Sequence, residues 1–149
     1  YPAIFTGKGL VVAHQVHIDA NTPFLMDNNI KIDTTPMSHA VEGLSLAIAI
    51  NGIRICYSAD TRKTDALIKL AKDSNLLICN VFGCDEKAAE SSGFMSAVGA
   101  AELARESGAG RLVMLHLNDD SSRKAAVSTA QKYFSGIIES PQSGTNILI

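Results

Sequence analysis

The sequence has 149 residues, which is enough for one domain with a substantial hydrophobic core. Apolar and aromatic residues make up 46 % of the chain and charged residues 19 %, as is ordinary for a globular protein. The net charge of −2 argues against a nucleic-acid polyanion held by bulk electrostatics. No apolar run reaches the roughly 20 residues that span a bilayer, so no membrane partner is expected.

Cysteine usage predicts a reduced, cytoplasmic setting. Three cysteines cannot all pair, and Cys56 and Cys79 fall in segments that are expected to be buried strands. The chain begins with Tyr1 rather than Met, which is compatible with a start partway into a longer gene product. We expect a single domain over residues 1–149, without internal repeats.

The first third of the chain predicts a β-meander. The β-branched segments Gly9–Ile18 and Ile30–Thr34 and the alternating segment Gly43–Ile50 are typical of strands. Asn51–Gly52 is the strongest short hairpin signal in the chain, and it predicts antiparallel pairing of Gly43–Ile50 with Ile53–Ser58.

The middle of the chain alternates strands with helices, which is typical of an α/β layer. The expected elements are an amphipathic helix with Ala66, Leu67, Leu70 and Ala71 on one face, a strand at Asn75–Val81, a helix at Ser96–Ser107 and an apolar strand at Arg111–Leu117. Strand carboxyl ends carry the chemistry in such layers. Residues that directly follow these strands are therefore the first candidates for a site.

The end of the chain predicts one more helix and a small hairpin. Asp119–Ser122 supplies N-cap candidates for a helix that runs to about Tyr133. Gly136–Glu139 and Asn146–Ile149 flank a turn at Pro141–Gly144 and are expected to pair as two short strands at a sheet edge.

Three metal-competent side chains lie in a loop or at an expected strand end: His39, Asp60 and His116. Imidazole and carboxylate are the ligands that catalytic zinc and related metals use. The chain has no phosphate-binding glycine loop, no dinucleotide-binding glycine motif and no nucleophile elbow. His14 and His17 have odd spacing in an expected strand and so lie on opposite faces, which favours one packed and one solvated histidine.

Each candidate also has a purely structural interpretation. Asp60 could cap a helix that begins near Arg62, and His116 could be a buried histidine bonded to a backbone carbonyl. His39 could be an exposed loop side chain. Phe94 is expected to anchor the start of the following helix in the core because it is apolar.

The order of these segments resembles the metallo-β-lactamase superfamily. The resemblance rests on the loop with His39, the Tyr-Ser-Ala-Asp-Thr motif of Tyr57–Thr61, the helix start at Ser92–Ala97 and the strand end at Leu115–Leu117. It extends over about Thr35–Leu117 and is nearest to the RNase Z-like and phosphodiesterase-type branch. It implies an α/β (α+β) fold, namely the C-terminal βα half of an αββα sandwich with an N-terminal β-meander.

By this resemblance, His39, Asp60 and His116 are ligands of a two-metal zinc or manganese centre, and Asp60 is the bridging, catalytic carboxylate. The implied activity is hydrolysis of a phosphodiester or related ester, with a small-molecule or nucleotide-like phosphoester as substrate. The family's His-x-His-x-Asp-His motif does not occur in the 149 residues. We therefore expect a partial domain and an incomplete centre that needs a missing N-terminal half or a partner chain.

Phe94 stands where this branch usually has a histidine close to the substrate phosphate, which predicts weak activity because phenylalanine donates no proton. A catalytically silent interaction subunit of the same fold is therefore one alternative, and a homodimer is compatible with it. Another is an unrelated α/β small-molecule-binding domain, in which the placement of the histidines and Asp60 is coincidental. The sequence upstream of Tyr1 discriminates best, because the ligand motif there would favour the enzyme.

Overall fold

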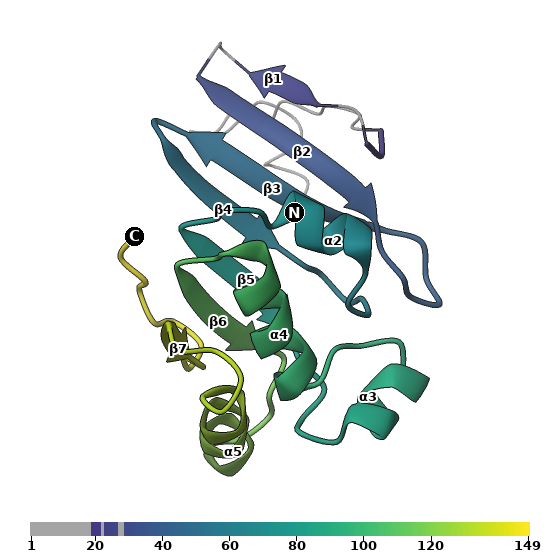
Figure 1. The fold of residues 1–149 in the computed structure, drawn as a ribbon, viewed down its shortest axis with the longest axis vertical. Helices are drawn as coiled ribbons and strands as arrows, with labels where there is room; N and C mark the ends of the chain where they lie inside the picture. The colour runs from purple at the N-terminus through teal and green to yellow at the C-terminus, as the bar shows by residue number, and fades with distance from the viewer. Residues whose placement is uncertain (1–18, 22, 27–28) are drawn as a thin grey trace, which may run out of the picture.

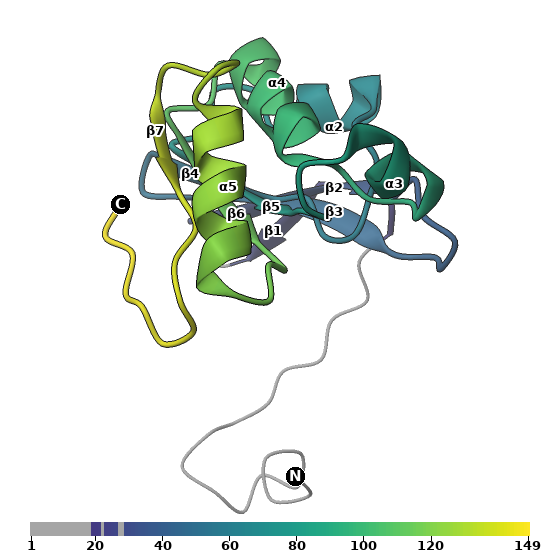
Figure 2. The same ribbon diagram turned by 90° about the horizontal axis from the view of Figure 1, so that it is seen from below.

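The computed structural model describes residues 19–21, 23–26 and 29–149. Within these ranges, seven strands form one mixed sheet in the order β1-β2-β3-β4-β5-β6-β7. They are β1 (Phe24–Met26), β2 (Ile30–Pro36), β3 (Leu44–Ile50), β4 (Ile53–Tyr57), β5 (Leu76–Asn80), β6 (Arg111–Leu115) and β7 (Ile137–Glu139). The described helices are α2 (Asp65–Leu70), α3 (Glu86–Ser91), α4 (Ala97–Ser107) and α5 (Asp120–Ala130). All of them lie on one face of the sheet (Figures 1 and 2).

The sheet changes from antiparallel to parallel pairing at β4. Strands β1 to β4 pair antiparallel, and β4 to β7 pair parallel through helical crossovers. The hairpin between β3 and β4 is confirmed: Asn51 and Gly52 have φ values of 49° and 81°, as a type I′ turn requires. The predicted meander and βα layer are both present.

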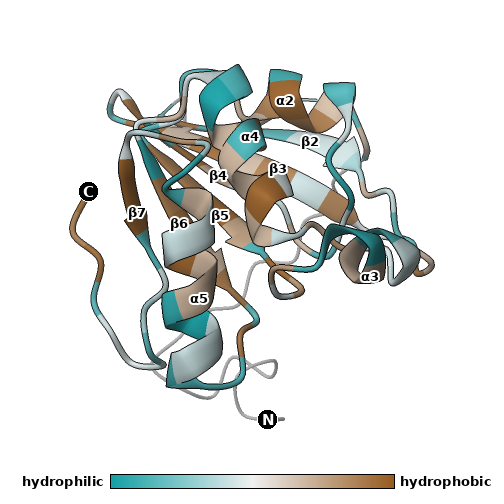
Figure 3. Ribbon diagram, turned by 60° about the horizontal axis from the view of Figure 1, so that its bottom comes forward, coloured by the Kyte–Doolittle hydropathy of each residue, from teal (hydrophilic) through white to brown (hydrophobic). Residues whose placement is uncertain are grey.

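Helix α4 covers the middle of the sheet. The Ser96 hydroxyl caps it by accepting a hydrogen bond of 3.1 Å from the Gly99 amide, and Gly108 ends it with φ 71° in the left-handed region. Its buried face consists mainly of alanines around Leu103, so the helix can lie close to the strands. Hydrophobic residues run along β3 to β6 beneath it (Figure 3).

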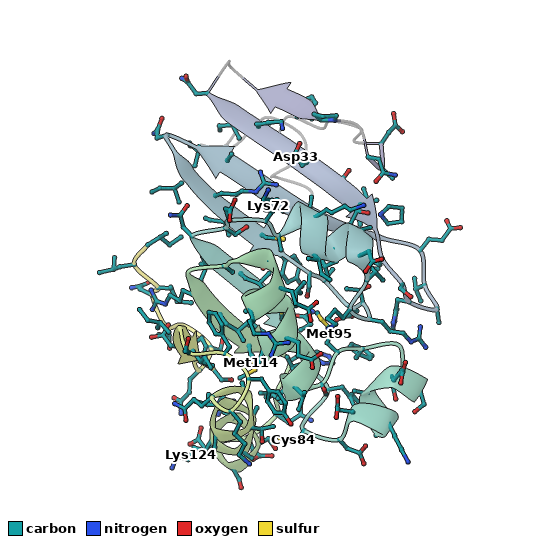
Figure 4. All side chains as sticks on the ribbon, in the orientation of Figure 1. Asp33, Lys72, Cys84, Met95, Met114 and Lys124 are labelled. Carbon is teal, nitrogen blue, oxygen red and sulfur yellow. The ribbon has the colours of Figure 1, made fainter. Side chains whose placement is uncertain are left out.

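A polar contact fastens β2, β4 and α2 together. The Arg54 guanidinium donates 3.0 Å to Asp33 on β2 and 2.8 Å to the carbonyl of Leu70 at the end of α2; Asp33 is labelled in Figure 4. Burial alone would raise the pKa of Asp33, but hydrogen bonds from Lys31 and Arg54 outweigh it and hold that pKa below its ordinary value. The carboxylate therefore stays charged at neutral pH.

All three cysteines are free thiols. Burial raises the pKa of Cys56 to about 12, and burial together with the neighbouring Cys56 raises the pKa of Cys79 still more. Both thiols therefore stay protonated at neutral pH and pack as small hydrophobic side chains. Cys84 is exposed beside α5, where Thr129 Oγ1 lies 3.6 Å from its sulfur (Figure 4).

Two parts of the predicted fold need correction, and one cannot be compared. Residues 146–149 form no strand, so the expected C-terminal hairpin is wrong; β7 pairs parallel with β6 instead. The Arg111 guanidinium contacts both segments in these positions, because it pairs with Glu139 of β7 and donates a hydrogen bond of 2.7 Å to the carbonyl of Leu148. The last helix ends at Ala130 rather than near Tyr133. The strand expected at Gly9–Ile18, with His14 and His17, lies outside the described residues.

Two described elements were not predicted, namely β1 and α3. Helix α3 has only six residues and begins at a cap on Asp85, whose carboxylate accepts 3.0 Å from the Ala88 amide. Among the described residues, no helix is long and apolar enough to cross a membrane.

Leu103→Ala is expected to lower the free energy of unfolding by about 2–5 kcal/mol, because the side chain is fully buried and its loss leaves a cavity. Leu148→Ala is the matched control: the same atoms are removed from a side chain that is 87 % exposed, so the change should be within about 0.5 kcal/mol. Urea unfolding followed by circular dichroism measures both. Equal losses in the two variants would contradict the assignment of α4 to the core.

Candidate active site

His39 lies in the loop between β2 and β3, and hydrogen bonds of Ser38 and His39 join this loop to two distant segments. The Ser38 amide donates 2.8 Å to Thr61 Oγ1, next to Asp60 in the chain. His39 Nδ1 lies 2.9 Å from the carbonyl oxygen of Gly93, which can only accept, so Nδ1 carries the proton. The Nε2 lone pair is then available to a metal, and a carbonyl behind the ring is a usual way of orienting a metal-binding imidazole.

Asp60 follows the end of β4 and is half-buried. Asn80, the last residue of β5, donates its side-chain amide to Asp60 Oδ1 at 2.7 Å and to Tyr57 Oη at 3.0 Å. The helix-capping interpretation of Asp60 is wrong, because Thr64 is the N-cap of α2 and accepts a hydrogen bond from the Leu67 amide. The carboxylate is instead oriented by the neighbouring strand.

Ser58 fixes the backbone that leads to Asp60. This buried residue donates its backbone amide to the Ile78 carbonyl at 2.9 Å, and its hydroxyl accepts a hydrogen bond of 3.2 Å from the backbone amide of Asn80. Ala59 then adopts φ 54°, a left-handed conformation that costs a non-glycine residue about 1–3 kcal/mol. Such strain persists only where the surroundings impose it, and here it turns the chain sharply before Asp60.

His116 follows β6 and is exposed, so its interpretation as a buried histidine is wrong. Its backbone also lies in the left-handed region, with φ 69°. The Leu115 carbonyl accepts 3.0 Å from the Val81 amide, which keeps the ends of β6 and β5 together. His116 therefore emerges at the same sheet edge as Asp60 and Asn80.

Phe94 contacts both histidines. Its ring meets His39 edge-on with the ring centroids 5.0 Å apart, and it stacks on His116 at 5.2 Å with an interplanar angle of 11°. Phe82 stacks on the same ring at 5.7 Å. Phe94 is thus only partly the core anchor that the sequence predicts, because it is half-buried and packs among the candidate ligands.

Gly93 is the backbone position that permits the contact with His39. Its φ of 80° lies in the left-handed region, and a Cβ there would stand 2.7 Å from His39 Nδ1. Gly93 and Asn80 are the residues that sequence reasoning missed. For Asn80 a signal existed: it is a polar residue at the end of a buried strand, parallel to the strand that leads to Asp60.

The three candidates converge only in part. His39 and His116 share the Phe94 ring, and Asp60 is joined to this edge through Asn80, whose register partner on β6 is Leu115. In the part of the chain that the structure describes, no three His, Cys, Asp or Glu side chains are grouped closely enough to hold a metal ion. Each of the three side chains is chemically suited to bind a metal ion, but together they would supply only some of the ligands of a metal centre. Their role as ligands stays a prediction.

Comparison with known proteins identifies the class. A family profile described as "Beta-lactamase superfamily domain" matches residues 2–117. The chain is 40 % identical over 84 residues to a ribonuclease Z of Methanothermobacter thermautotrophicus, a match of 54 % of the chain and 27 % of that protein. It is 30 % identical over 108 residues to the "Probable metallo-hydrolase YhfI" of Bacillus subtilis, covering 71 % of the chain and 43 % of that relative.

Solved structures agree on the fold. The crystal structure of YhfI superimposes with a TM-score of 0.80 at 24 % identity, over 87 % of this chain and 54 % of YhfI. The short form of human tRNase Z gives a TM-score of 0.57 at 22 % identity, over 62 % of this chain and 38 % of that one.

The chain therefore belongs to the β-lactamase superfamily domain family, and the predicted metallo-β-lactamase fold and RNase Z-like branch are confirmed. Its matches to the two curated relatives span 27 % and 43 % of their lengths.

Gly93→Ala should displace the His39 imidazole, because the new methyl group would collide with Nδ1. Gly52→Ala is the matched control: Gly52 has a nearly identical φ of 81° but nothing within 4 Å of the added Cβ. Both variants should lose about 1–2 kcal/mol through backbone strain. Only Gly93→Ala should move the His39 ring resonances in ¹H–¹⁵N NMR spectra. Unchanged His39 resonances in Gly93→Ala would refute the contact.

Proposed function

We propose that this chain is part of a metal-dependent hydrolase that cleaves a phosphodiester or a related ester. The observation that supports this most directly is the contact of one ring, Phe94, with both candidate histidines, at the edge where Asp60 emerges. The ribonuclease Z and metallo-hydrolase relatives supply the reaction class. A zinc or manganese pair is the cofactor that this donor chemistry suits.

The chain's own residues would orient and hold the reaction partners. His39 offers Nε2 because its Nδ1 is engaged by Gly93, and Asp60 offers its second oxygen because Asn80 engages the first. His116 would hold metal as well, so that His39, Asp60 and His116 would be this chain's contribution to the metal pair. When bound, such a pair supplies Lewis acidity toward a phosphoryl oxygen and lowers the pKa of a water.

Proton transfer is the step for which these residues are least suited. Phe94 has no titratable group, and the Asn80 side-chain amide donates hydrogen bonds but is neither an acid nor a base near neutral pH. A missing general acid typically costs a factor of about 10²–10⁴ in rate. We therefore propose that activity is weak unless a residue outside the described part of the chain donates the proton.

A catalytically silent interaction subunit is the second candidate. Two observations favour it: Phe94 cannot transfer a proton, and the described His, Asp and Glu side chains do not form a group that could hold a metal ion. The packing of Phe94 on the two histidines requires neither metal nor catalysis. On this hypothesis the chain still uses the metallo-β-lactamase fold, and the missing half, a partner chain or a second copy completes its surface. The ligand motif His-x-His-x-Asp-His upstream in the reading frame would favour the hydrolase, and its absence would favour the silent subunit.

The chain alone should retain much less than one zinc ion per molecule after dialysis, because two imidazoles and one carboxylate cannot fill two coordination spheres. Inductively coupled plasma mass spectrometry measures the metal content. Near-stoichiometric zinc in the isolated 149 residues would contradict the incomplete centre.

A longer protein that includes an upstream ligand motif should bind about two metal ions. In that protein, Asp60→Asn should weaken zinc binding by at least the roughly 10-fold that loss of an outer-sphere partner costs. Asp65→Asn is the matched control, because this exposed carboxylate lies in the first turn of α2. Competition with a chelator measures both affinities. Equal affinities of the two variants would remove Asp60 from the metal site; the unrelated binding domain is already excluded by the family match.

A further inference from the structure

An aromatic surface extends outward from the candidate active site. Phe82, Phe94 and His116 form a continuous stack, with Phe94 in the middle at 5.7 Å from Phe82 and 5.2 Å from His116. These are ordinary distances for offset-stacked rings. Phe82 is the outer member and is 42 % exposed, although it is a large apolar side chain. Its backbone is held in place, because its amide donates 2.9 Å to the Met95 carbonyl.

Phe82 and His116 line the same cavity. This cavity has a volume of about 330 Å³ and lies between the segment that follows β5 and the segment that follows β6. It is near the lower end of the range of about 300–1,000 Å³ for small-molecule sites, so it suits one planar group rather than a large ligand. Because His116 is also a candidate ligand, an occupant of the cavity would adjoin the candidate metal centre.

The cavity also presents polar groups beside the aromatic wall. Asn118 lines it, and no hydrogen bond among the described residues engages the Asn118 side-chain amide, which can both donate and accept. Ser122 also lines the cavity, and its hydroxyl donates 2.9 Å to Asp119 Oδ2, so its oxygen can accept a hydrogen bond from an occupant. An aromatic face with amide and hydroxyl groups at its side matches a heterocycle that has a π-face and a hydrogen-bonding edge.

We infer that this cavity binds an unpaired nucleobase of the substrate, stacked on Phe82 and read at its edge by Asn118. This inference rests on the proposed function, which it narrows from phosphoesters in general to nucleotide phosphoesters. The base would lie on the Phe82 side and its phosphate on the side of His116. A base inside a duplex has no free face for Phe82, so the site selects single-stranded or free nucleotides.

Two probes separate the base from the phosphate. Adenosine carries the base without a phosphate, and ribose 5-phosphate carries the phosphate without a base. Dissociation constants come from NMR shift titrations of the chain, with ribose as the reference for adenosine. Adenosine should bind about 5- to 150-fold more tightly than ribose, which is the range for stacking of one base on an aromatic side chain. It should also shift the Phe82 and His116 ring resonances.

Variants of Phe82 test the aromatic face itself. Phe82→Leu keeps an apolar side chain but should abolish the preference for adenosine, whereas Phe82→Trp should retain it. Tyr133→Leu is the matched control, because Tyr133 is also aromatic and 39 % exposed but does not line the cavity. It should leave adenosine binding unchanged. Thermal unfolding of each variant checks that the fold is intact.

The outcomes distinguish this inference from the proposed function. Equal affinities for adenosine and ribose in the unchanged protein, or an undiminished preference in Phe82→Leu, would overturn the base site, whatever ribose 5-phosphate does. Because the chain alone is not expected to retain zinc, zinc-dependent binding of ribose 5-phosphate is measured in the longer protein that includes the upstream ligand motif. Binding of adenosine at Phe82 without such binding of ribose 5-phosphate would support the base site and count against the hydrolase. A protein segment that covers Phe82 would prevent adenosine binding and would likewise overturn the inference.

Discussion

Parallel pairing of β4, β5 and β6 is the constraint on which the rest of the site depends. Three neighbouring parallel strands deliver their carboxyl ends to one edge of the sheet, and their register sets Asn80 opposite Leu115. Asp60 and His116 follow two of these strands, and Asn80 ends the third. The hydrogen bonds of Ser58 and Val81 then hold these strand ends together. Candidate ligands far apart in the sequence therefore emerge at one edge of the sheet because of backbone pairing rather than local sequence.

The sequence predicts those features that depend on short-range pattern. Alternation of small and large residues identified β3, and Asn51–Gly52 identified the turn to β4, because both signals act within a few residues. The partner of β7 was not predictable, because β6 precedes it by a whole helix and the contacts of Arg111 with Glu139 and the Leu148 carbonyl join residues far apart in the sequence. For the same reason Asp60 could be named as a candidate, whereas the hydrogen bond that orients it could not.

Phe94 and Asn80 contact the candidate ligands as neutral side chains, so neither can act as the acid or the base of a catalytic pair. Asn80 stabilises the Asp60 carboxylate with a neutral amide, so it adds no charge that would compete with a cation. Phe94 holds two imidazoles by contact alone. Orientation of the candidate ligands and transfer of protons are thus separable: Asn80 and Phe94 contribute to the first and cannot perform the second. A hydrolase with a donor elsewhere and a silent subunit both fit this division, and they differ in residues outside the described part.

The face of the sheet opposite the helices is apolar along β2, β3 and β4. Ile32, Ile48 and Ile55 are register partners across β2, β3 and β4, and they alternate with the helix-facing Ala47 and Cys56. No described helix covers this face (Figure 2). In a sandwich an apolar sheet face of this kind packs against a second sheet. If the proposed centre is completed by a further segment, a segment that packs on this face would both bury these isoleucines and bring further metal ligands, and folding and metal binding would then be coupled.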